Sequence, residues 1–319
     1  MLSDGQKLGA FIVPTGVGAS IGGFAGDASV FARKLTEKCR LIVNPNVVNA
    51  ACFSGINEKM FYVEGYSLDE FFREKCRLIP SKNNKVGVVF DKSISQAVLN
   101  VHINTINAVK TVYGIDVIGY EITEEPVGVD FFVNESGIST GNVTNLRTLK
   151  TASEKLINRG ADTVAIVCLF PDEESEDYAN GIGADPVGGV EAVISHYISK
   201  ELKVPCAHSP AFENITISTD IVDARCSAEY ITPTFLPCIL LGLSQAPKLS
   251  KTDGISIDNL DFVVMPYNSL GGIPVFEANK RNITVYAVKE NQTVLDVTQE
   301  KLGLNIREVK SYQEIFDII

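Results

Sequence analysis

The chain has no hydrophobic run long enough to cross a membrane and no excess of basic residues. Its longest apolar stretch, around residues 235–243, is interrupted by Pro237 and Gly242, whereas a transmembrane helix needs about 20 apolar residues. The N-terminal sequence MLSDGQKLGAFIV lacks the basic and apolar segments of a signal peptide. The net charge is −11, and an acidic surface repels the phosphates of nucleic acids. We therefore expect a cytoplasmic protein that binds neither membranes nor nucleic acids.

The chain also lacks the sequence patterns of disulfide, zinc and nucleotide sites. Its seven cysteines include no CxxC pair, and without an export signal they are expected to be reduced. The stretch PTGVGASIGGFAGDASVF is spaced GxGxxxGG rather than GxGxxG, and no Gly-Lys-Ser/Thr follows it. The second expected strand ends in Asn44-Pro45 rather than in the acid that would hold a ribose. We expect no NAD, FAD or ATP, and a metal ion only as an alternative.

Short apolar, β-branched runs alternate with longer helical patterns. Strands are predicted at residues 8–13, 40–43, 86–90, 116–122, 163–168, 205–208, 262–265 and 284–288, and helices at 28–38, 93–113, 146–159, 187–202 and 273–280. Most of these strands are apolar throughout, which favours mainly parallel sheets flanked by helices in an α/β fold. We expect one module over residues 1–319, with candidate lobes at 1–124 and 125–319 around a cleft. The polar segment 80–85 is a candidate connection between lobes.

Two glycine- or amide-rich segments follow the first two strands. In the first, glycines permit positive φ, so that backbone N–H groups can surround an anion; a tight structural turn is the alternative. The candidate residues there are Thr15, Gly16, Gly18, Gly22 and Gly23. The second, NPNVVNAAC, places the amides of Asn44, Asn46 and Asn49 close together. Amides suit carboxylate or carbonyl ligands, and turn formation by Asn-Pro is the alternative.

Two further segments are candidates for substrate binding. NESGISTGNVTN is predicted to be a loop leading into a helix N-terminus, where free N–H groups attract anions; simple helix capping is the alternative. Its candidates are Ser136, Ser139, Thr140 and Asn142. PYNSLGGIP is predicted to be a strand-to-helix turn with candidates Asn268, Gly271 and Gly272, and Asn291 follows the next strand. Because such turns lie at the carboxyl ends of parallel strands, we expect them to converge on one cleft.

The segment from residue 178 to 212 contains two of the three histidines in the chain. Asp185 followed by Pro186 is typical of a helix start. Glu191 and His196 are five residues apart on that helix, so they should face different directions. Cys206 and His208 should project from one face of the next strand. The pair can perform acid–base or nucleophilic chemistry, or contribute to a metal site; the alternative is a buried thiol beside a hydrogen-bonded histidine.

Several segments resemble one known family. VPTGVGASIGGFAGDA, VNESGISTGNVTNLRTL, GIGADPVGGVEAVISH, VPCAHSPA and TFLPCILLGLSQAP are similar to the domain of unknown function 3326, found mainly in cyanobacteria and photosynthetic eukaryotes. The resemblance implies a single full-length module in the cytosol or a plastid, and it supplies no catalytic assignment. Asn268 departs from the small residue or cysteine expected at its position. TFLPCILLGLSQAP itself predicts a core helix with a proline at its start.

The sequence thus predicts a small-molecule enzyme, an isomerase, lyase or hydrolase acting on a carboxylate- or carbonyl-bearing substrate by acid–base or thiol chemistry. Its candidate catalytic residues are Cys206, His208, Glu191 and His196, and its binding residues are those named above together with Asp185. The expected partner is a small anion or carboxylate, and the chain is a candidate homo-oligomer. The alternatives are a metal-dependent hydrolase or lyase, a non-catalytic ligand-binding or regulatory protein, and a racemase using Cys52 and Cys168, whose flanking sequences lack the aspartate/glutamate racemase patterns.

Overall fold

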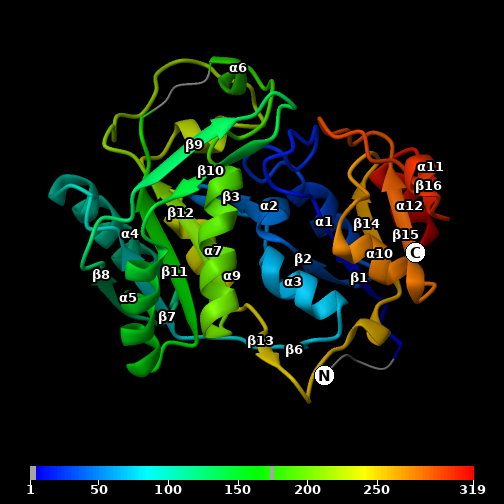
Figure 1. Ribbon diagram of the computed structural model, residues 1–319, viewed down its shortest axis with the longest axis horizontal. Helices are drawn as coiled ribbons and strands as arrows, with labels where there is room; N and C mark the ends of the chain where they lie inside the picture. The colour runs from blue at the N-terminus through cyan, green and yellow to red at the C-terminus, as the bar shows by residue number, and fades with distance from the viewer. Residues whose placement is uncertain (1–4, 173–175) are drawn as a thin grey trace.

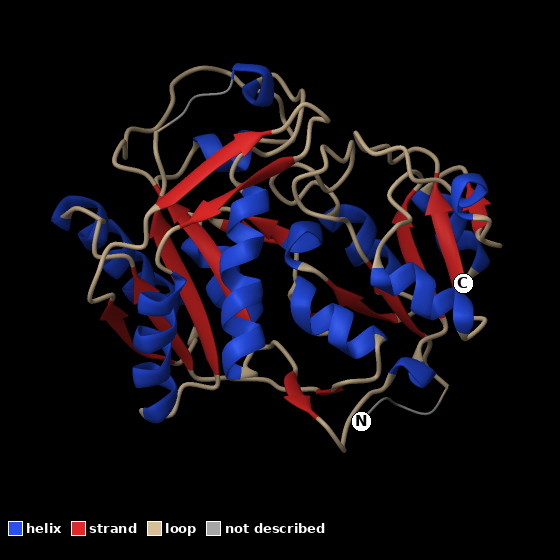
Figure 2. Ribbon diagram, viewed as in Figure 1, coloured by secondary structure: helices blue, strands red, loops and turns tan. Residues whose placement is uncertain are grey.

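Runs of Val, Ile, Leu and Phe form two parallel β-sheets in the computed structural model, which describes residues 5–172 and 176–319. Figures 1 and 2 show the four-stranded sheet on the left and the six-stranded sheet on the right. The larger sheet has the order β16-β15-β14-β1-β2-β5 and the smaller β12-β11-β7-β8. The α/β fold predicted from the sequence is therefore confirmed. The strands are β1 (Leu8–Phe11), β2 (Arg40–Val43), β5 (Met60–Tyr62), β7 (Val86–Phe90), β8 (Val117–Ile122), β11 (Thr163–Leu169), β12 (Cys206–Ala211), β14 (Phe262–Pro266), β15 (Thr284–Val288) and β16 (Arg307–Val309).

The eight predicted strands and five predicted helices are all present, with shifts of a few residues at their ends. The sequence did not predict β5 or β16, which have only three residues each, or the helices α3 and α12, which are short and carry mixed polar and apolar residues. The main helices are α1 (Ser29–Leu35), α3 (Gly65–Phe72), α4 (Gln96–Tyr113), α5 (Leu146–Asn158), α7 (Gly188–Leu202), α9 (Leu236–Ser244), α10 (Ile273–Lys280) and α12 (Tyr312–Ile318). Shorter elements are α2 (Pro45–Val48), β3 (Asn49–Ala50), β4 (Phe53–Ser54), α6 (Glu176–Ala179), α8 (Ser227–Tyr230), η1 (Ile257–Asn259) and α11 (Gln299–Leu302).

The chain crosses between the two sheets twice. It leaves the six-stranded sheet through β6 (Arg77–Ile79) and returns through β13 (Lys248–Ser250), and these two strands pair antiparallel. The predicted connection at residues 80–85 directly follows β6. The sheets do not divide the chain at residues 124 and 125, because β7 and β8 pair in one sheet with β11 and β12. Strand pairing joins segments that meet in space, whatever their order along the chain.

A β-hairpin covers the N-terminal end of α7. Its strands are β9 (Val129–Val133) and β10 (Ser139–Val143), so the loop predicted at the N-terminus of a helix is instead a hairpin turn and its second strand. Gly189 at the start of α7 lies against this hairpin: a Cβ atom there would come within 2.0 Å of the Ser139 carbonyl oxygen. Because Gly189 has no side chain, the hairpin can pack directly on α7. The hairpin also contacts the first glycine loop, since the N–H of Ser139 donates to the Gly16 carbonyl at 2.8 Å.

Helix α9 joins the cores of the two sheets. It packs against β11 and β12 of the smaller sheet and against β3 and β4, which follow β2 of the larger one. Its Gly242 lies so close to Tyr62 that a Cβ atom would approach the ring to 2.7 Å. The core helix predicted there, with Pro237 in its first turn, is confirmed. None of the helices in the described ranges combines the length and the apolar character needed to span a bilayer.

Candidate functional site

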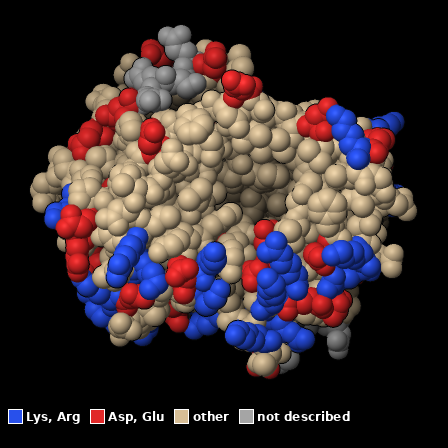
Figure 3. Space-filling view, in the orientation of Figure 1, with Lys and Arg blue, Asp and Glu red and all other residues tan. Residues whose placement is uncertain are grey.

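A cavity of about 1130 Å³ opens between the two sheets. Figure 3 shows it as a hollow near the centre of the molecule. Its wall includes Pro14 after β1, Asn46 after β2, Glu64 after β5 and Gly271 after β14, together with His208 on β12. Because parallel strands end at the same edge of a sheet, the loops after them lie side by side, and this edge is where open α/β folds bind ligands.

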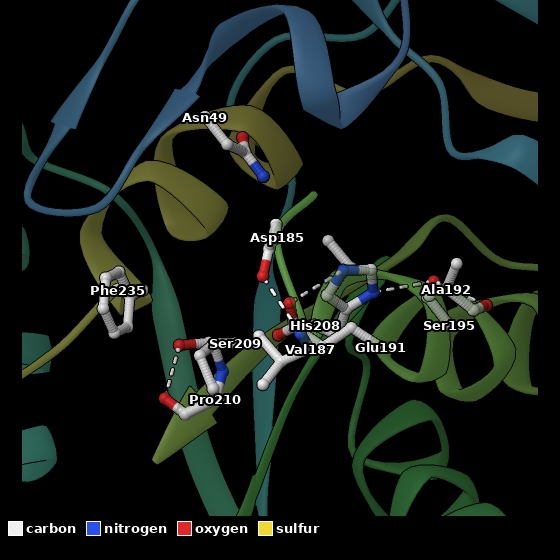
Figure 4. A network of polar contacts seen from close by, with 12 residues as sticks. Asn49, Asp185, Val187, Glu191, Ala192, Ser195, His208, Ser209, Pro210 and Phe235 are labelled. Carbon is white, nitrogen blue, oxygen red and sulfur yellow. Dashed lines mark hydrogen bonds and ion pairs between the residues drawn. The ribbon is translucent and has the colours of Figure 1, made fainter. Parts of the chain in front are cut away.

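Glu191 on α7 and His208 on β12 face each other at the wall of this cavity (Figure 4). Glu191 Oε2 lies 3.8 Å from His208 Nε2, and His208 Nδ1 lies 2.9 Å from Ser195 Oγ. Ser195 donates its hydroxyl proton to the Ala192 carbonyl at 3.3 Å, so its oxygen accepts from Nδ1–H. This network assigns the free lone pair of a neutral imidazole to Nε2.

Burial holds both members of this pair in their neutral forms. Removal from water lowers the pKa of His208 from 6.5 to about 3, and nearby His196 acts in the same direction. Burial also raises the pKa of Glu191 well above its usual value, with added repulsion from Asp185 and Glu229. Although 3.8 Å is within ion-pair range, the cost of desolvation outweighs the attraction. One group can therefore donate a proton while the other accepts one.

Asp185 and Glu229 place two more carboxyl groups beside Glu191. Asp185 precedes α7 and accepts a hydrogen bond from the Val187 N–H at 3.0 Å; burial raises the pKa of its carboxyl. Burial and then the charge of Asp185 raise the pKa of Glu229 to about 8, against the opposing effect of a hydrogen bond with Tyr178. Three carboxyl groups that repel one another thus share one wall of the cavity.

His196 points away from Glu191 and toward the other sheet. Its Nε2 lies 3.8 Å from Oε2 of Glu64, a buried residue that accepts hydrogen bonds from the N–H groups of Tyr66 and Ser67 at the start of α3. A Cβ atom on Gly65 would approach the His196 ring to 2.4 Å. Glu191 and His196 therefore face different neighbours, as their spacing predicted, yet both line the same cavity.

The charged residues that line the described part of the cavity are all acidic, apart from its two histidines. No lysine or arginine among the described residues contributes to the wall, so the lining gives no support to the predicted anionic or carboxylate partner. Within the described ranges no group of three or more His, Cys, Asp or Glu residues is arranged to hold a metal ion. The acidic residues of the wall are Glu64, Asp69, Asp172, Asp185, Glu191, Asp220 and Glu229.

The structure brings about half of the predicted site residues to the cavity. Those that line it are Thr15, Gly23, Asn44, Asn46, Asp185, Glu191, His196, His208, Gly271 and Gly272. Those placed elsewhere in the described structure are Gly16, Gly18, Gly22, Ser136, Ser139, Thr140, Asn142, Cys206, Asn268 and Asn291.

The predicted amides mostly hold the chain together rather than facing a ligand. Asn44 exchanges two hydrogen bonds with the backbone of Val13, at 2.7 and 3.0 Å. Asn268 donates to the carbonyl of Thr293 at 3.0 Å and also to that of Leu295. Asn291 is fully buried, where it contacts Ile21 and the Tyr312 hydroxyl. The hydrogen-bonding capacity that suggested ligand contacts is used within the fold.

Cys206 lies in the core and not on the cavity wall. It is 1% exposed and packs with apolar residues of α5 and α7, and burial raises the pKa of its thiol well above the usual value. Cys206 and His208 are alternate residues of β12, but Cys206 packs in the core under α7, whereas His208 lines the cavity. Cys168 is also buried in that core, and Cys52 is not part of the wall. This placement does not favour thiol chemistry.

Sequence reasoning missed several residues that shape the cavity. Glu64 and Asp69 lie at the start of α3, which was not predicted. Glu229 and Phe235 come from the long segment between β12 and α9, whose composition has no recognisable pattern. For Glu64, the Glu-Gly pair directly after the apolar run Met60–Tyr62 could have indicated a strand end at the same sheet edge.

Comparisons with known proteins give a consistent result. The family described as "Protein of unknown function (DUF3326)" matches residues 9–319. A protein of Synechococcus sp. (strain ATCC 27144) named "Uncharacterized lipoprotein" is 36% identical over 313 residues, which cover 95% of this chain and 87% of that protein. No solved structure matches the chain.

Proposed function

We propose that this chain, which belongs to the DUF3326 family, is an acid–base enzyme that moves a proton on a small carbonyl-bearing molecule held between its two sheets. His208 acts as the base through Nε2, and the carboxyl group of Glu191 acts as the acid. Ser195 is a positioning residue, since its hydroxyl oxygen contacts Nδ1 of His208, the ring nitrogen that does not face Glu191. The observation that carries the proposal is the approach of Glu191 and His208 to 3.8 Å at the wall of a large cavity, where burial favours the neutral form of each.

The chemistry follows from the two protonation states. A neutral imidazole can remove a proton from a carbon next to a carbonyl group, while a neutral carboxyl can protonate the carbonyl oxygen. The C–H electron pair becomes a C=C bond, and the carbonyl π pair takes the proton from Glu191. Return of a proton to a different carbon completes an isomerisation, and loss of a leaving group completes an elimination. Isomerase and lyase reactions fit this pair better than nucleophilic catalysis, because the Cys206 thiol is enclosed in the core.

Proton exchange with solvent tests this proposal on simple compounds, whatever the natural substrate is. Small ketones, aldehydes and imines are incubated with the protein in D₂O, and loss of C–H signals is followed by NMR. For an accepted compound, Glu191→Gln and His208→Gln should each slow exchange by about 10²- to 10⁴-fold, the usual contribution of a general acid or base. Glu201→Gln, at an exposed position of the same helix, is the matched control and should exchange as the unaltered protein does.

The main competing function is non-catalytic ligand binding. It predicts that His208→Gln changes ligand affinity but that no compound exchanges protons faster with the protein than without it. A metal-dependent hydrolase or lyase predicts activity that is lost with a chelator and restored by a divalent ion. Exchange that survives both Glu191→Gln and His208→Gln would disprove the assigned roles.

A cytoplasmic location is part of the same proposal. The acidic surface charge and the absence of a spanning helix in the described ranges support it, whereas the "lipoprotein" in the name of the Synechococcus relative favours a membrane-anchored alternative. Fractionation of cells that produce the native protein separates the two. We expect it in the supernatant after ultracentrifugation; recovery in a pellet that only detergent extracts would support the anchored form.

A further inference from the structure

The cavity wall is rich in acidic side chains, and no lysine or arginine of the described residues lies in it. Seven carboxyl groups among the described residues line it. Arg225 lies near the cavity but is already engaged: it pairs with Asp223 at 3.0 Å and donates to the Gly181 carbonyl at 2.8 Å. Acidic groups brought together without a counter-charge resist ionisation, and a positively charged ligand would stabilise their ionised forms.

One carboxyl oxygen in this wall has no partner. Glu191 is only 7% exposed, and its Oε1 makes no hydrogen bond with any residue in the described ranges. A buried acceptor without a donor costs free energy. Oε2 is directed at His208, so Oε1 is left to accept from something that enters the cavity. Figure 4 shows Asp185, Glu191 and His208 facing one another around the space that such a donor would occupy.

Aromatic rings complete the same wall. Phe24, Tyr178 and Phe235 line the cavity near the acidic groups, and the rings of Phe24 and Tyr178 stack with centroids 5.1 Å apart. The guanidinium of Arg225 already lies over Phe24, 4.4 Å from the ring centroid. Phe24 is therefore already engaged by Tyr178 and Arg225. Because aromatic faces attract organic cations, the half-buried Phe235 is the ring that suits a ligand with both positive charge and apolar surface.

The arrangement favours an organic cation over a metal ion. A metal ion needs three or more ligands converging at short distance, and the described residues provide no such group. An ammonium group, by contrast, can be bound by separate hydrogen-bond acceptors that lie on different sides of it. It donates three hydrogen bonds, and the separate carboxyl groups of Asp185, Glu191 and Glu229 provide acceptors.

We propose that the cavity binds a small molecule carrying a protonated amine, held by Asp185, Glu191 and Glu229. This inference rests on the proposed function, because it assigns the charge of the substrate that the Glu191–His208 pair acts on. The amine would be placed beside the reacting carbon. The carbonyl of the same molecule, or an imine derived from it, would face Glu191.

Binding should release protons. Burial raises the pKa of Asp185, and it raises that of Glu229 to about 8, so Glu229 carries a proton near neutral pH and an ammonium group favours its ionised form. Glu191 keeps its proton for the reaction and accepts from the ammonium group through Oε1. The other titratable groups that face this cluster from the described elements include Asp27 near the start of α1, Tyr178 on α6, Cys168 on β11, His208 on β12 and Cys238 on α9. Calorimetry in two buffers with different ionisation enthalpies would reveal the proton release.

The test uses three probes with the same four-carbon chain. These are 1,4-diaminobutane, the neutral 1,4-butanediol and the dianion succinate, each titrated into the full-length protein by calorimetry. We expect the diamine to bind at least ten times more tightly than the diol, and succinate to bind most weakly. Zinc and magnesium chloride are titrated separately. Failure of the diamine to bind, or equal or tighter binding of the diol, succinate or either metal, would overturn the inference.

Variants localise the binding and separate this inference from the proposed function. Glu229→Gln should weaken diamine binding by about tenfold, while Glu201→Gln, the exposed control on α7, should leave it unchanged. Circular dichroism confirms folding, and Asp185→Asn gives a second measurement if Glu229→Gln is unstable. His208→Gln should keep diamine affinity within about twofold. Proton exchange that survives His208→Gln counts against the catalytic roles alone. Diamine binding that is equally tight in Glu229→Gln, Asp185→Asn and the unaltered protein counts against this inference alone.

Discussion

Oε2 of Glu191 lies 3.8 Å from Nε2 of His208, although 17 positions separate the two residues and they belong to different elements, α7 and β12. The hydroxyl of Ser195, one turn further along α7, holds the other nitrogen of the ring. A helix and the strand that follows it thus fix the position and the tautomer of a single imidazole. The same α7 presents His196 to Glu64 on the opposite sheet, so this helix connects the proposed chemistry to both halves of the cavity wall.

Acid should destabilise the protein partly through His102. This histidine is fully buried on α4, and burial lowers its pKa from 6.5. The unfolded chain therefore binds a proton more readily than the folded one below about pH 6.5, and the free energy of unfolding falls as the pH decreases through that value. Urea denaturation between pH 8 and 5 should show a smaller decrease for His102→Gln than for the unaltered protein. Parallel curves would contradict the prediction.

Cys206 should be protected from alkylation in the folded protein. It is 1% exposed, and burial raises the pKa of its thiol, which removes both access and the reactive thiolate. Iodoacetamide followed by peptide mass spectrometry should modify the partly exposed Cys52 and Cys76 before Cys206. In denaturant all these thiols should react. Rapid modification of Cys206 in the native state would restore it as a candidate nucleophile.

Gly189→Ala should destabilise the fold by about 2 kcal/mol, within the usual range for overpacking. The new methyl group would meet the backbone of Ser139 at 2.0 Å, and this loss exceeds the roughly 1 kcal/mol that alanine gains over glycine in a helix. Gly188→Ala is the matched comparison, because its closest contacts, at 2.9 Å, are side-chain atoms of Asp185 and Thr15 that can move. Thermal denaturation should rank Gly189→Ala as clearly the less stable.

Asp91→Asn should cost about 2–3 kcal/mol, the usual range for lost hydrogen bonds to a charged group. Asp91 is 1% exposed at the end of β7, and its carboxylate accepts from the N–H groups of Ser93 and Val127, at 3.0 and 3.1 Å. Both bonds end on Oδ1, and Oδ2 accepts from the N–H of Leu169 at 3.4 Å. An amide would therefore turn its NH₂ group either toward the Leu169 donor or toward the other two. The exposed Asp116→Asn is the control and should change the urea midpoint little. Equal effects of the two substitutions would disprove the assigned role of Asp91.

The order of residues along the chain was enough to predict most of the elements and the sheet edge at which the cavity lies. Apolar runs such as Val86–Phe90 predict strands that are covered on both faces, because the side chains on each face of such a strand are apolar. All five residues of this strand are indeed buried. Asp185-Pro186 indicated the start of α7 to within three residues, since the helix begins at Gly188 with Val187 as its N-cap. The alternation of strands and helices identified the α/β class. These features depend on residues close together in the chain, where periodicity and turn preferences act directly.

Only the tertiary structure decided which residues share the cavity. Cys206 and His208 belong to one strand face, but α7 covers the first and leaves the second at the cavity wall. Glu64 and Glu229 reach the same space from segments 165 positions apart, through the double crossing at β6 and β13. Burial and the approach of like charges, which set the protonation of Glu191 and His208, arise from packing between distant segments. No local pattern encodes that packing, so the charge of the cavity could be recognised only after the chain had folded.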